Sequence, residues 1–311
     1  MFDPHPNPPP EYKGREELSA ASDAHPTRLD NARRKRIVSQ AMSGEQQNGH
    51  VFVGGAGRSG TTLMRVLLDA HRRICCGPEL KVLPYVSELY QLTLAMGSVT
   101  EAYGNTLADV QGCFRQFVES LSANFRRASG KPRWAEKTPH NVLSMAPLGT
   151  MFPDARFIHV IRDGRDVACS LVTMDWFDPR TGAKRDYVQN VAKAAGYWRR
   201  IVQHARQQAA DPALAGRVIE VRYEALVADV EGIMRQVLDF LGEAWDPAIL
   251  EAHKKSRAHE PRESSTDQAT KPIYDTSIGR WKRDMSPADR IAFKSEAGPL
   301  LKELGYAPED W

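Results

Sequence analysis

A glycine-rich stretch is the part of the sequence whose residue types point most directly to chemistry. It reads GAGRSGTT over residues 55–62 and directly follows a short apolar run, VFV, at residues 51–53. Apolar residues at helical spacing continue to Leu68, so we expect a strand, a loop and a helix. Glycines at a helix start let successive backbone N–H groups turn toward an anion. The stretch therefore predicts a binding site for a phosphate or a sulfate.

This loop differs from the loop of nucleotide triphosphatases at one important position. The spacing from Gly55 to Gly60 fits G-x-x-x-x-G-K-[ST], but Thr61 stands where the lysine is expected. That lysine reaches the β- and γ-phosphates of ATP, so its absence disfavours ATP hydrolysis, while Arg58 offers a different cation. A glycine-rich loop alone is a weak indication, and a purely structural turn remains the alternative.

The elements around the loop predict the fold class. Short apolar runs recur at Arg156–Ile161 and Arg217–Val221, and long segments with helical spacing, such as Val191–Ala209, separate the runs. This alternation predicts a central parallel sheet flanked by helices, an α/β three-layer sandwich of the P-loop type. The polar stretch Glu260–Lys271 predicts a long ordered or closing loop.

Composition limits the classes of partner and the domain count. The 311 residues carry a net charge of only +3, so we expect no nucleic-acid partner. Residues 1–49 are polar and proline-rich and predict a flexible tail, followed by a single domain over residues 50–311. No apolar run reaches the roughly 20 residues that cross a bilayer, and the N-terminus lacks the apolar centre of a signal peptide. We therefore expect a cytoplasmic protein with no membrane partner, and reduced thiols at all four cysteines.

Four segments, taken in order, resemble one known family. VFVGGAGRSGTTLMRVLLDAH resembles the 5′-phosphosulfate loop of sulfotransferases that use 3′-phosphoadenosine-5′-phosphosulfate (PAPS), especially the protein-tyrosine sulfotransferase branch. FPDARFIHVIRDGRDVACS resembles the family's clamp for the 3′-phosphate of the donor. VRYEALV and ESSTDQATKPIYDTSIGRW resemble its nucleotide-contacting and closing segments. The resemblance implies transfer of a sulfuryl group from PAPS to an acceptor hydroxyl, with the desulfated nucleotide PAP as product.

The resemblance also implies a set of donor-binding residues. Arg162 ends an apolar strand, where ligands of parallel sheets bind, and its planar fork suits a phosphate. A surface ion pair with Asp163 or Asp166 is the alternative for Arg162, and Arg165 is expected to brace the loop through a carboxylate. The implied donor-binding residues are Arg58, Ser59, Gly60, Thr61, Thr62, Arg162, Ser170, Tyr223, Ser265 and Arg280.

Three residues match the family's catalytic positions. Sulfuryl transfer needs a base for the acceptor proton and cations for the charge that develops on the transferring and leaving groups. The resemblance assigns Glu79 as the base, Lys137 to the bridging oxygen and Arg58 to the sulfuryl group. Glu79 and Lys137 each have a plain alternative as a surface charge, and His140 stays open as a rival base. His159 lies inside an apolar run and is expected to pack there. The chemistry requires no metal, and the sequence shows no ligand cluster for one.

The sequence departs from the tyrosine branch in ways that concern the acceptor. Lys81 and Tyr85 stand where that branch carries arginines for acidic peptides. Eukaryotic members are membrane-anchored in the secretory pathway, so the lack of an anchor predicts a bacterial cytoplasmic enzyme instead. Its acceptor would be a tyrosyl, phenolic, sugar or lipid hydroxyl, on a peptide or a small molecule. Apolar residues of Val86–Lys131 are expected mostly to pack helices, with a few lining an acceptor pocket.

Three further questions stay open at this stage. A homodimer is one of the oligomeric states that the sequence allows. A P-loop kinase that uses ATP is the second functional hypothesis, because the same loop can serve both chemistries. A nucleotide-binding scaffold without turnover is the third.

Overall fold

The structure is a computed structural model, and it describes residues 49–178, 181–254, 273 and 275–307. Three sequence predictions therefore lie outside the described residues, wholly or almost wholly: the tail over residues 1–49, the closing loop Glu260–Lys271, and Ser265. The division into a tail and a domain over residues 50–311 stays a prediction.

Five parallel strands form the central sheet in the order β2-β3-β1-β4-β5. The strands are β1 Val51–Gly55, β2 Ile74–Cys76, β3 Arg133–Lys137, β4 Arg156–Ile161 and β5 Val218–Arg222. In the register, Val53 of β1 pairs with Lys137 of β3 on one side and Ile158 of β4 on the other. Because all strands are parallel, their carboxyl ends share one edge, and the glycine-rich loop leaves β1 at that edge.

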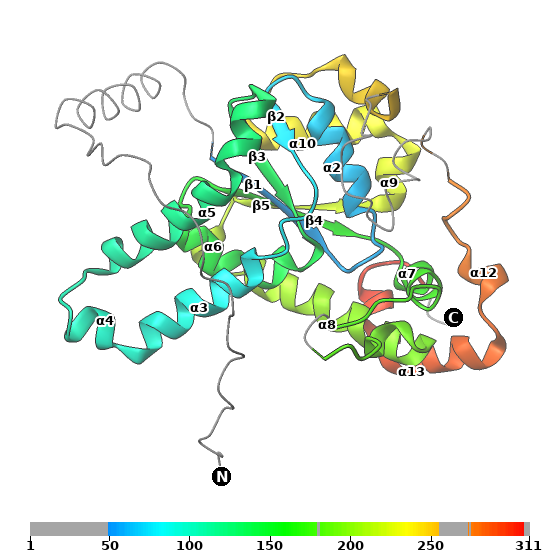
Figure 1. The fold of residues 1–311 in the computed structure, drawn as a ribbon. Helices are drawn as coiled ribbons and strands as arrows, with labels where there is room; N and C mark the ends of the chain where they lie inside the picture. Colours follow the sequence, from blue (N-terminus) through cyan, green and yellow to red (C-terminus); the bar gives the residue numbers. More distant parts are fainter. Residues whose placement is uncertain (1–48, 179–180, 255–272, 274, 308–311) are drawn as a thin grey trace, which may run out of the picture. The chain divides into compact units, whose positions relative to one another are not determined.

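Helices cover both faces of this sheet (Figure 1). Val51 and Val53 point to one face and Phe52 to the other, as period-two alternation requires. The first face packs against α2 Thr61–Ala70, α9 Tyr223–Ala228, α10 Val230–Leu241 and η4 Pro247–Lys254. The second packs against α3 Leu83–Met96, α5 Leu107–Ser129, α6 Met145–Met151, α7 Gly164–Leu171, α8 Val191–Ala209 and α13 Pro287–Glu303. The remaining elements are α4 Ser98–Glu101, α12 Trp281–Asp284, η1 Pro139–Leu143, η2 Asp186–Val188 and η3 Pro212–Leu214.

The predicted α/β sandwich with a parallel sheet is confirmed. Strand β4 and helix α8 have the predicted bounds, and β5 begins one residue later than expected. Strand β2 was not predicted because its three residues, Ile74–Cys76, are too few to show a period. All four cysteines are free thiols. Among the described residues, no helix combines the length and apolar character needed to cross a membrane.

The helices between β2 and β3 correct one prediction. Helices α3 and α5 lie side by side and connect through α4 (Figure 1). Tyr90 and Phe114 pack edge to face between them, with ring centroids 5.4 Å apart. Several other apolar residues of this segment are exposed instead of packed, because each helix turns only one face to the protein. These are Leu89 (55% exposed), Leu92 (48%), Tyr103 (81%) and Phe117 (50%).

Candidate active site

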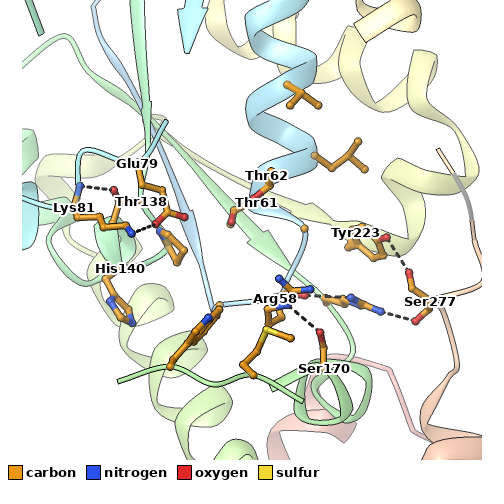
Figure 2. A pocket seen from close by; sticks show the side chains of 18 of the residues that line it. Arg58, Thr61, Thr62, Glu79, Lys81, Thr138, His140, Ser170, Tyr223 and Ser277 are labelled. Carbon is orange, nitrogen blue, oxygen red and sulfur yellow. Dashed lines mark hydrogen bonds and ion pairs between the residues drawn. The ribbon is translucent and has the colours of Figure 1, made fainter. Parts of the chain in front are cut away.

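A cavity of about 900 Å³ opens at the carboxyl edge of the sheet. Its wall combines the glycine-rich loop, the residues that follow β3 and β4, the start of α3, residues 173–177, Arg185 and Tyr187. Figure 2 shows two groups of side chains around the loop: Glu79, Lys81 and His140 lie on one side, and Ser170, Tyr223 and Ser277 on the other. After the roles that the sequence predicts for these residues, we call the two groups the acceptor side and the donor side of the cavity.

The loop's shape depends on a glycine at the start of α2. Gly60 has φ 94°, in the left-handed region that favours glycine. A Cβ atom there would lie 2.2 Å from a ring carbon of Tyr223, so the backbone and the ring approach too closely for any side chain. Arg58 also has a positive φ, 72°, which costs on the order of 1 kcal/mol in a non-glycine residue and is common at ligand sites.

Arginines and hydroxyls converge on the donor side of this loop. Arg58 Nε donates to Ser170 Oγ at 2.9 Å, and Arg162 donates to the Arg58 carbonyl at 3.1 Å. The Arg162 guanidinium also donates to the Ser277 carbonyl and lies 4.6 Å from the centroid of the Tyr223 ring. The Tyr223 hydroxyl is 3.0 Å from Ser277 Oγ. One interacting set thus joins four segments that are far apart in the sequence.

Two polar atoms of this region are buried without a hydrogen-bond partner among the described residues. They are the Oγ atom of Ser59 and the Nε atom of Arg162. Buried polar atoms without partners cost free energy, so they commonly mark a place where a ligand completes the set. Both belong to the predicted donor site.

Asp166 fixes the segment that carries Arg280. Its carboxylate accepts the backbone N–H groups of Gly279 at 2.7 Å and Trp281 at 3.0 Å, and burial raises its pKa. The ion pair that Asp166 forms with Arg162 is long, 4.0 Å, so a surface ion pair does not account for Arg162.

Arg165 has a bracing role, as expected. It donates to both carboxylate oxygens of Asp163 and to the Tyr306 carbonyl, and its guanidinium stacks 3.9 Å from the Trp281 ring centroid. It is not among the residues that line the cavity.

On the acceptor side, Glu79 and Lys137 form a close ion pair. Lys137 Nζ is 2.5 Å from Glu79 Oε1 and 3.4 Å from Thr62 Oγ1 at the start of α2. Lys81 Nζ lies 3.8 Å from the other Glu79 oxygen. Glu79 lines the cavity, whereas the Lys137 side chain is fully buried behind it. The base and the lysine assigned from the resemblance are therefore adjacent.

A buried carboxylate, which the sequence reasoning missed, positions Glu79. Glu136 of β3 accepts the backbone N–H of Leu80 at 2.9 Å and the hydroxyl of Thr138 at 2.8 Å. Thr138 Oγ1 in turn accepts the Lys81 N–H at 3.1 Å (Figure 2). Burial raises the pKa of Glu136. The one feature of the sequence that could have pointed to Glu136 is an acidic residue within the short stretch WAEK, which forms part of β3.

Tyr197 of α8 joins the two sides and was also missed. Its hydroxyl accepts the N–H of Gly57 at 3.0 Å and lies 3.1 Å from Nε2 of His140. In the neutral ring, Nε2 either accepts the phenolic proton or donates to the phenolic oxygen, according to the tautomer. Burial, with a smaller contribution from Arg185, lowers the pKa of His140 and favours that neutral form. A tyrosine within an apolar helix face gave no indication of this role.

Aromatic rings cover the acceptor side of the cavity. Tyr187 stacks on Tyr197 with centroids 4.1 Å apart, and Trp176 meets Tyr187 edge to face at 6.3 Å. Phe177 also lines the cavity and is 55% exposed. Trp176 and Phe177 lie outside the helices and the sheet, and Tyr187 lies in the three-residue helix η2, so no sequence period pointed to them.

The structure gathers most of the predicted residues into this one cavity. Those that line it are Arg58, Gly60, Thr61, Thr62, Glu79, Arg162, Ser170, Tyr223 and Arg280, with His140. Ser59 and Lys137 are buried beside it, and Ser265 lies outside the described residues. His159 is fully buried within β4, where packing was expected. In the described part of the chain, no three His, Cys, Asp or Glu residues form a group that could hold a metal ion.

Fold and site together define the class: an α/β protein of the P-loop type with basic residues around an anion-binding loop. Residues 50–247 match the model of the Sulfotransferase family, and the chain belongs to that family. The predicted family is thereby confirmed.

Relatives of known name agree with this membership. The chain is 30% identical to protein-tyrosine sulfotransferase of Drosophila melanogaster, over 83% of this chain and 52% of that protein. It is also 30% identical to protein-tyrosine sulfotransferase A of Caenorhabditis elegans, over 83% of this chain and 67% of that protein. The chain thus spans about half the length of the fly relative.

Solved structures agree in fold. The sulfotransferase domain from the curacin biosynthetic pathway matches with a TM-score of 0.56 at 19% identity, covering 83% of this chain and 98% of that one. The sulfotransferase domain of the Synechococcus PCC 7002 olefin synthase matches with a TM-score of 0.53 at 23% identity, covering 81% and 95%.

The comparisons correct the predicted location. We expected a bacterial cytoplasmic enzyme, but the named relatives are protein-tyrosine sulfotransferases of animals. The expectation of a cytoplasmic protein is therefore wrong, and a bacterial source has no support from these relatives. It rested on the lack of an apolar segment, which says little about location.

Proposed function

We propose that the protein transfers the sulfuryl group of PAPS to a phenolic hydroxyl, with the tyrosyl hydroxyl of a peptide as the acceptor. The observation that carries the proposal is the convergence of the donor-side arginines and the Glu79–Lys137 pair on one cavity. The family membership and the names of the relatives support the same reaction.

The residues present fit a donor with an anion at each end. Arg58 and the backbone N–H groups at the start of α2 would hold the phosphosulfate. Arg162 and Ser170 would hold the 3′-phosphate, and the unpartnered Nε atom of Arg162 would gain an acceptor there. Tyr223 and Arg280 would contact the nucleotide from the start of α9 and from the residue before α12.

Three side chains would carry the transfer. As the acceptor oxygen bonds to sulfur, the bond from sulfur to the bridging phosphate oxygen breaks and the acceptor's proton passes to Glu79. Arg58 would stabilise the charge on the sulfuryl group, and Lys137 would stabilise the leaving phosphate. Lys137 is paired with Glu79 in this structure. With the donor bound, Lys137 would therefore interact with two anions, the Glu79 carboxylate and the leaving phosphate.

Glu79 is favoured over His140 as the base because of how each is bound. The Nε2 atom of His140 is hydrogen-bonded to the Tyr197 hydroxyl at 3.1 Å. The carboxylate of Glu79 lines the cavity and has two lysines beside it. A kinase that uses ATP loses support because the chain belongs to the sulfotransferase family and has Thr61 in place of the loop lysine. A sugar or lipid hydroxyl remains the second acceptor hypothesis, and a homodimer remains a prediction.

A titration with two nucleotides tests the donor site. Selective binding to the folded state raises the melting temperature, so the protein is titrated with PAP and, separately, with ATP plus Mg²⁺. We expect a concentration-dependent rise with PAP and little or none with ATP. A rise with ATP and Mg²⁺ alone would refute PAPS as the donor and restore the kinase hypothesis.

A further inference from the structure

One face of α3 carries an exposed row of large apolar side chains. The row, here called the α3 stripe, consists of Tyr85 (50% exposed), Leu89 (55%), Leu92 (48%) and Met96 (67%). Spacings of four, three and four residues place these side chains along a single face of a helix. Contiguous exposed apolar residues of this kind mark binding surfaces on proteins.

The α3 stripe begins at the active-site cavity. Tyr85 belongs both to the stripe and to the cavity lining. Its neighbour Pro84 also lines the cavity. Both residues lie in the first turn of α3, only a few positions after Glu79. A molecule whose hydroxyl reached Glu79 could therefore continue onto the stripe without leaving the protein surface.

The length of the stripe indicates an extended ligand. Eleven residue steps along a helix cover about 16 Å. An extended peptide rises about 3.3 Å per residue, so the stripe could contact about five residues of one. A small phenol would fill the cavity and leave the stripe uncovered.

Charge along the stripe argues against acidic flanking residues. The only charged residue of α3 is Glu88, which lies beside Tyr85 and Leu92 on the helix surface because it is three and four positions from them. Two cations at the nearby cavity wall are already paired: Lys81 with Glu79 at 3.8 Å, and Arg185 with Asp178 at 3.5 Å.

We propose that the acceptor is a tyrosyl peptide whose residues next to the tyrosine are apolar, and that those residues bind along the α3 stripe. This inference rests on the proposed function. It adds the chemical class of the segment that flanks the acceptor hydroxyl.

Steady-state kinetics with matched acceptors test the inference. The acceptors are a tyrosyl peptide with leucine and valine flanks, a peptide of equal length with aspartate and glutamate flanks, and N-acetyltyrosinamide. We expect a KM about tenfold lower for the apolar peptide than for the acidic one. The variant Leu89→Lys should raise the KM of the apolar peptide about tenfold and leave N-acetyltyrosinamide unaffected. Gln91→Lys adds the same charge to an exposed position off the stripe and should change neither value.

The outcomes separate this inference from the proposed function. If N-acetyltyrosinamide is sulfated but the acidic peptide has the lower KM, or Leu89→Lys has no effect, the inference is overturned alone. If Leu89→Lys abolishes an oligomer without changing any KM, the stripe is a contact between copies of the chain, and the inference is again overturned. If PAP binds but no phenol is sulfated, the proposed function is refuted, and the inference that rests on it is refuted as well.

Discussion

The donor and acceptor sides of the cavity are built in opposite ways. On the donor side, Arg58, Arg162, Ser170 and Ser277 are linked by short hydrogen bonds, and a glycine is required against Tyr223. On the acceptor side, Glu79, Lys81 and His140 lie beside a group of aromatic rings, of which Phe177 is 55% exposed. Under the proposed function, the contrast implies that a pre-formed polar set would fix the position of the nucleotide. The acceptor would be recognised more by shape and apolar contact.

Replacing the base at the border of the two sides should have the largest effect. Glu79→Gln keeps the size and a hydrogen bond to Lys137 but cannot take a proton. We expect kcat to fall about 10²–10⁴-fold with PAP affinity nearly unchanged, as measured by single-turnover kinetics and by PAP titration. Full activity in this variant would point to His140, and His140→Asn would then be the next variant to assay.

A single methyl group should disrupt the donor side. Gly60→Ala places a Cβ against the Tyr223 ring at a residue with positive φ, and we expect a loss of about 2–4 kcal/mol in the free energy of unfolding. PAP binding should be lost as well. Gly242→Ala is the control, because Gly242 has φ 72° at the end of α10 but no atom of the described residues lies within 4 Å of its Cβ position. Equal losses in both variants would mean that the close approach to Tyr223 is unimportant.

The Tyr197 hydroxyl connects the two sides through Gly57 and His140, and removing it tests that connection. Tyr197→Phe leaves the Gly57 N–H without its acceptor, which should cost about 1–2 kcal/mol and weaken PAP binding about tenfold. Calorimetric titration with PAP measures the change. Tyr187→Phe, which keeps the ring stacked on Tyr197, should bind PAP normally, and a similar loss there would argue against a specific role for the Tyr197–Gly57 bond.

The same connection should make stability depend on pH. The pKa of His140 is below its ordinary value of 6.5 in the folded protein, since burial and then Arg185 disfavour the charged ring. As pH falls through 6.5, the unfolded chain takes up a proton there before the folded chain does, so this residue's contribution to stability is lost. Chemical denaturation from about pH 8 to about pH 5.5 should therefore show a smaller decline in His140→Asn than in the unaltered protein. Parallel declines would contradict the neutral His140–Tyr197 pair.

The smallest effect is expected on the acceptor wall. Phe177→Ala removes an exposed ring, so stability should change by less than about 0.5 kcal/mol. The KM of a tyrosyl acceptor should rise about two- to fivefold, while PAP affinity stays constant. A large loss of PAP binding would erase the distinction between the two sides.

The same contrast explains what the sequence could predict. Two strand–loop–helix units carry most of the donor side, and within each unit the residues are close in the sequence. Arg58 to Thr62 and the Arg162–Ser170 segment were therefore identifiable. The strands that precede these two segments, β1 and β4, both showed short apolar runs in the sequence.

Residues that act through distant partners were not identifiable. Tyr197 touches Gly57 across 140 positions, and Ser277 touches Arg162 across 115. Glu136 reads as an ordinary strand residue until β3 is placed beside the segment that carries Glu79. Pairings of this kind depend on sheet order, which no local pattern specifies.

The central claim is tested most directly by incubating the purified protein with PAPS and N-acetyltyrosinamide and following both products by mass spectrometry. The account predicts sulfated N-acetyltyrosinamide and PAP in equal amounts, with neither formed above background by Glu79→Gln. Release of PAP without a sulfated phenol, or no reaction despite saturable PAP binding, would contradict it.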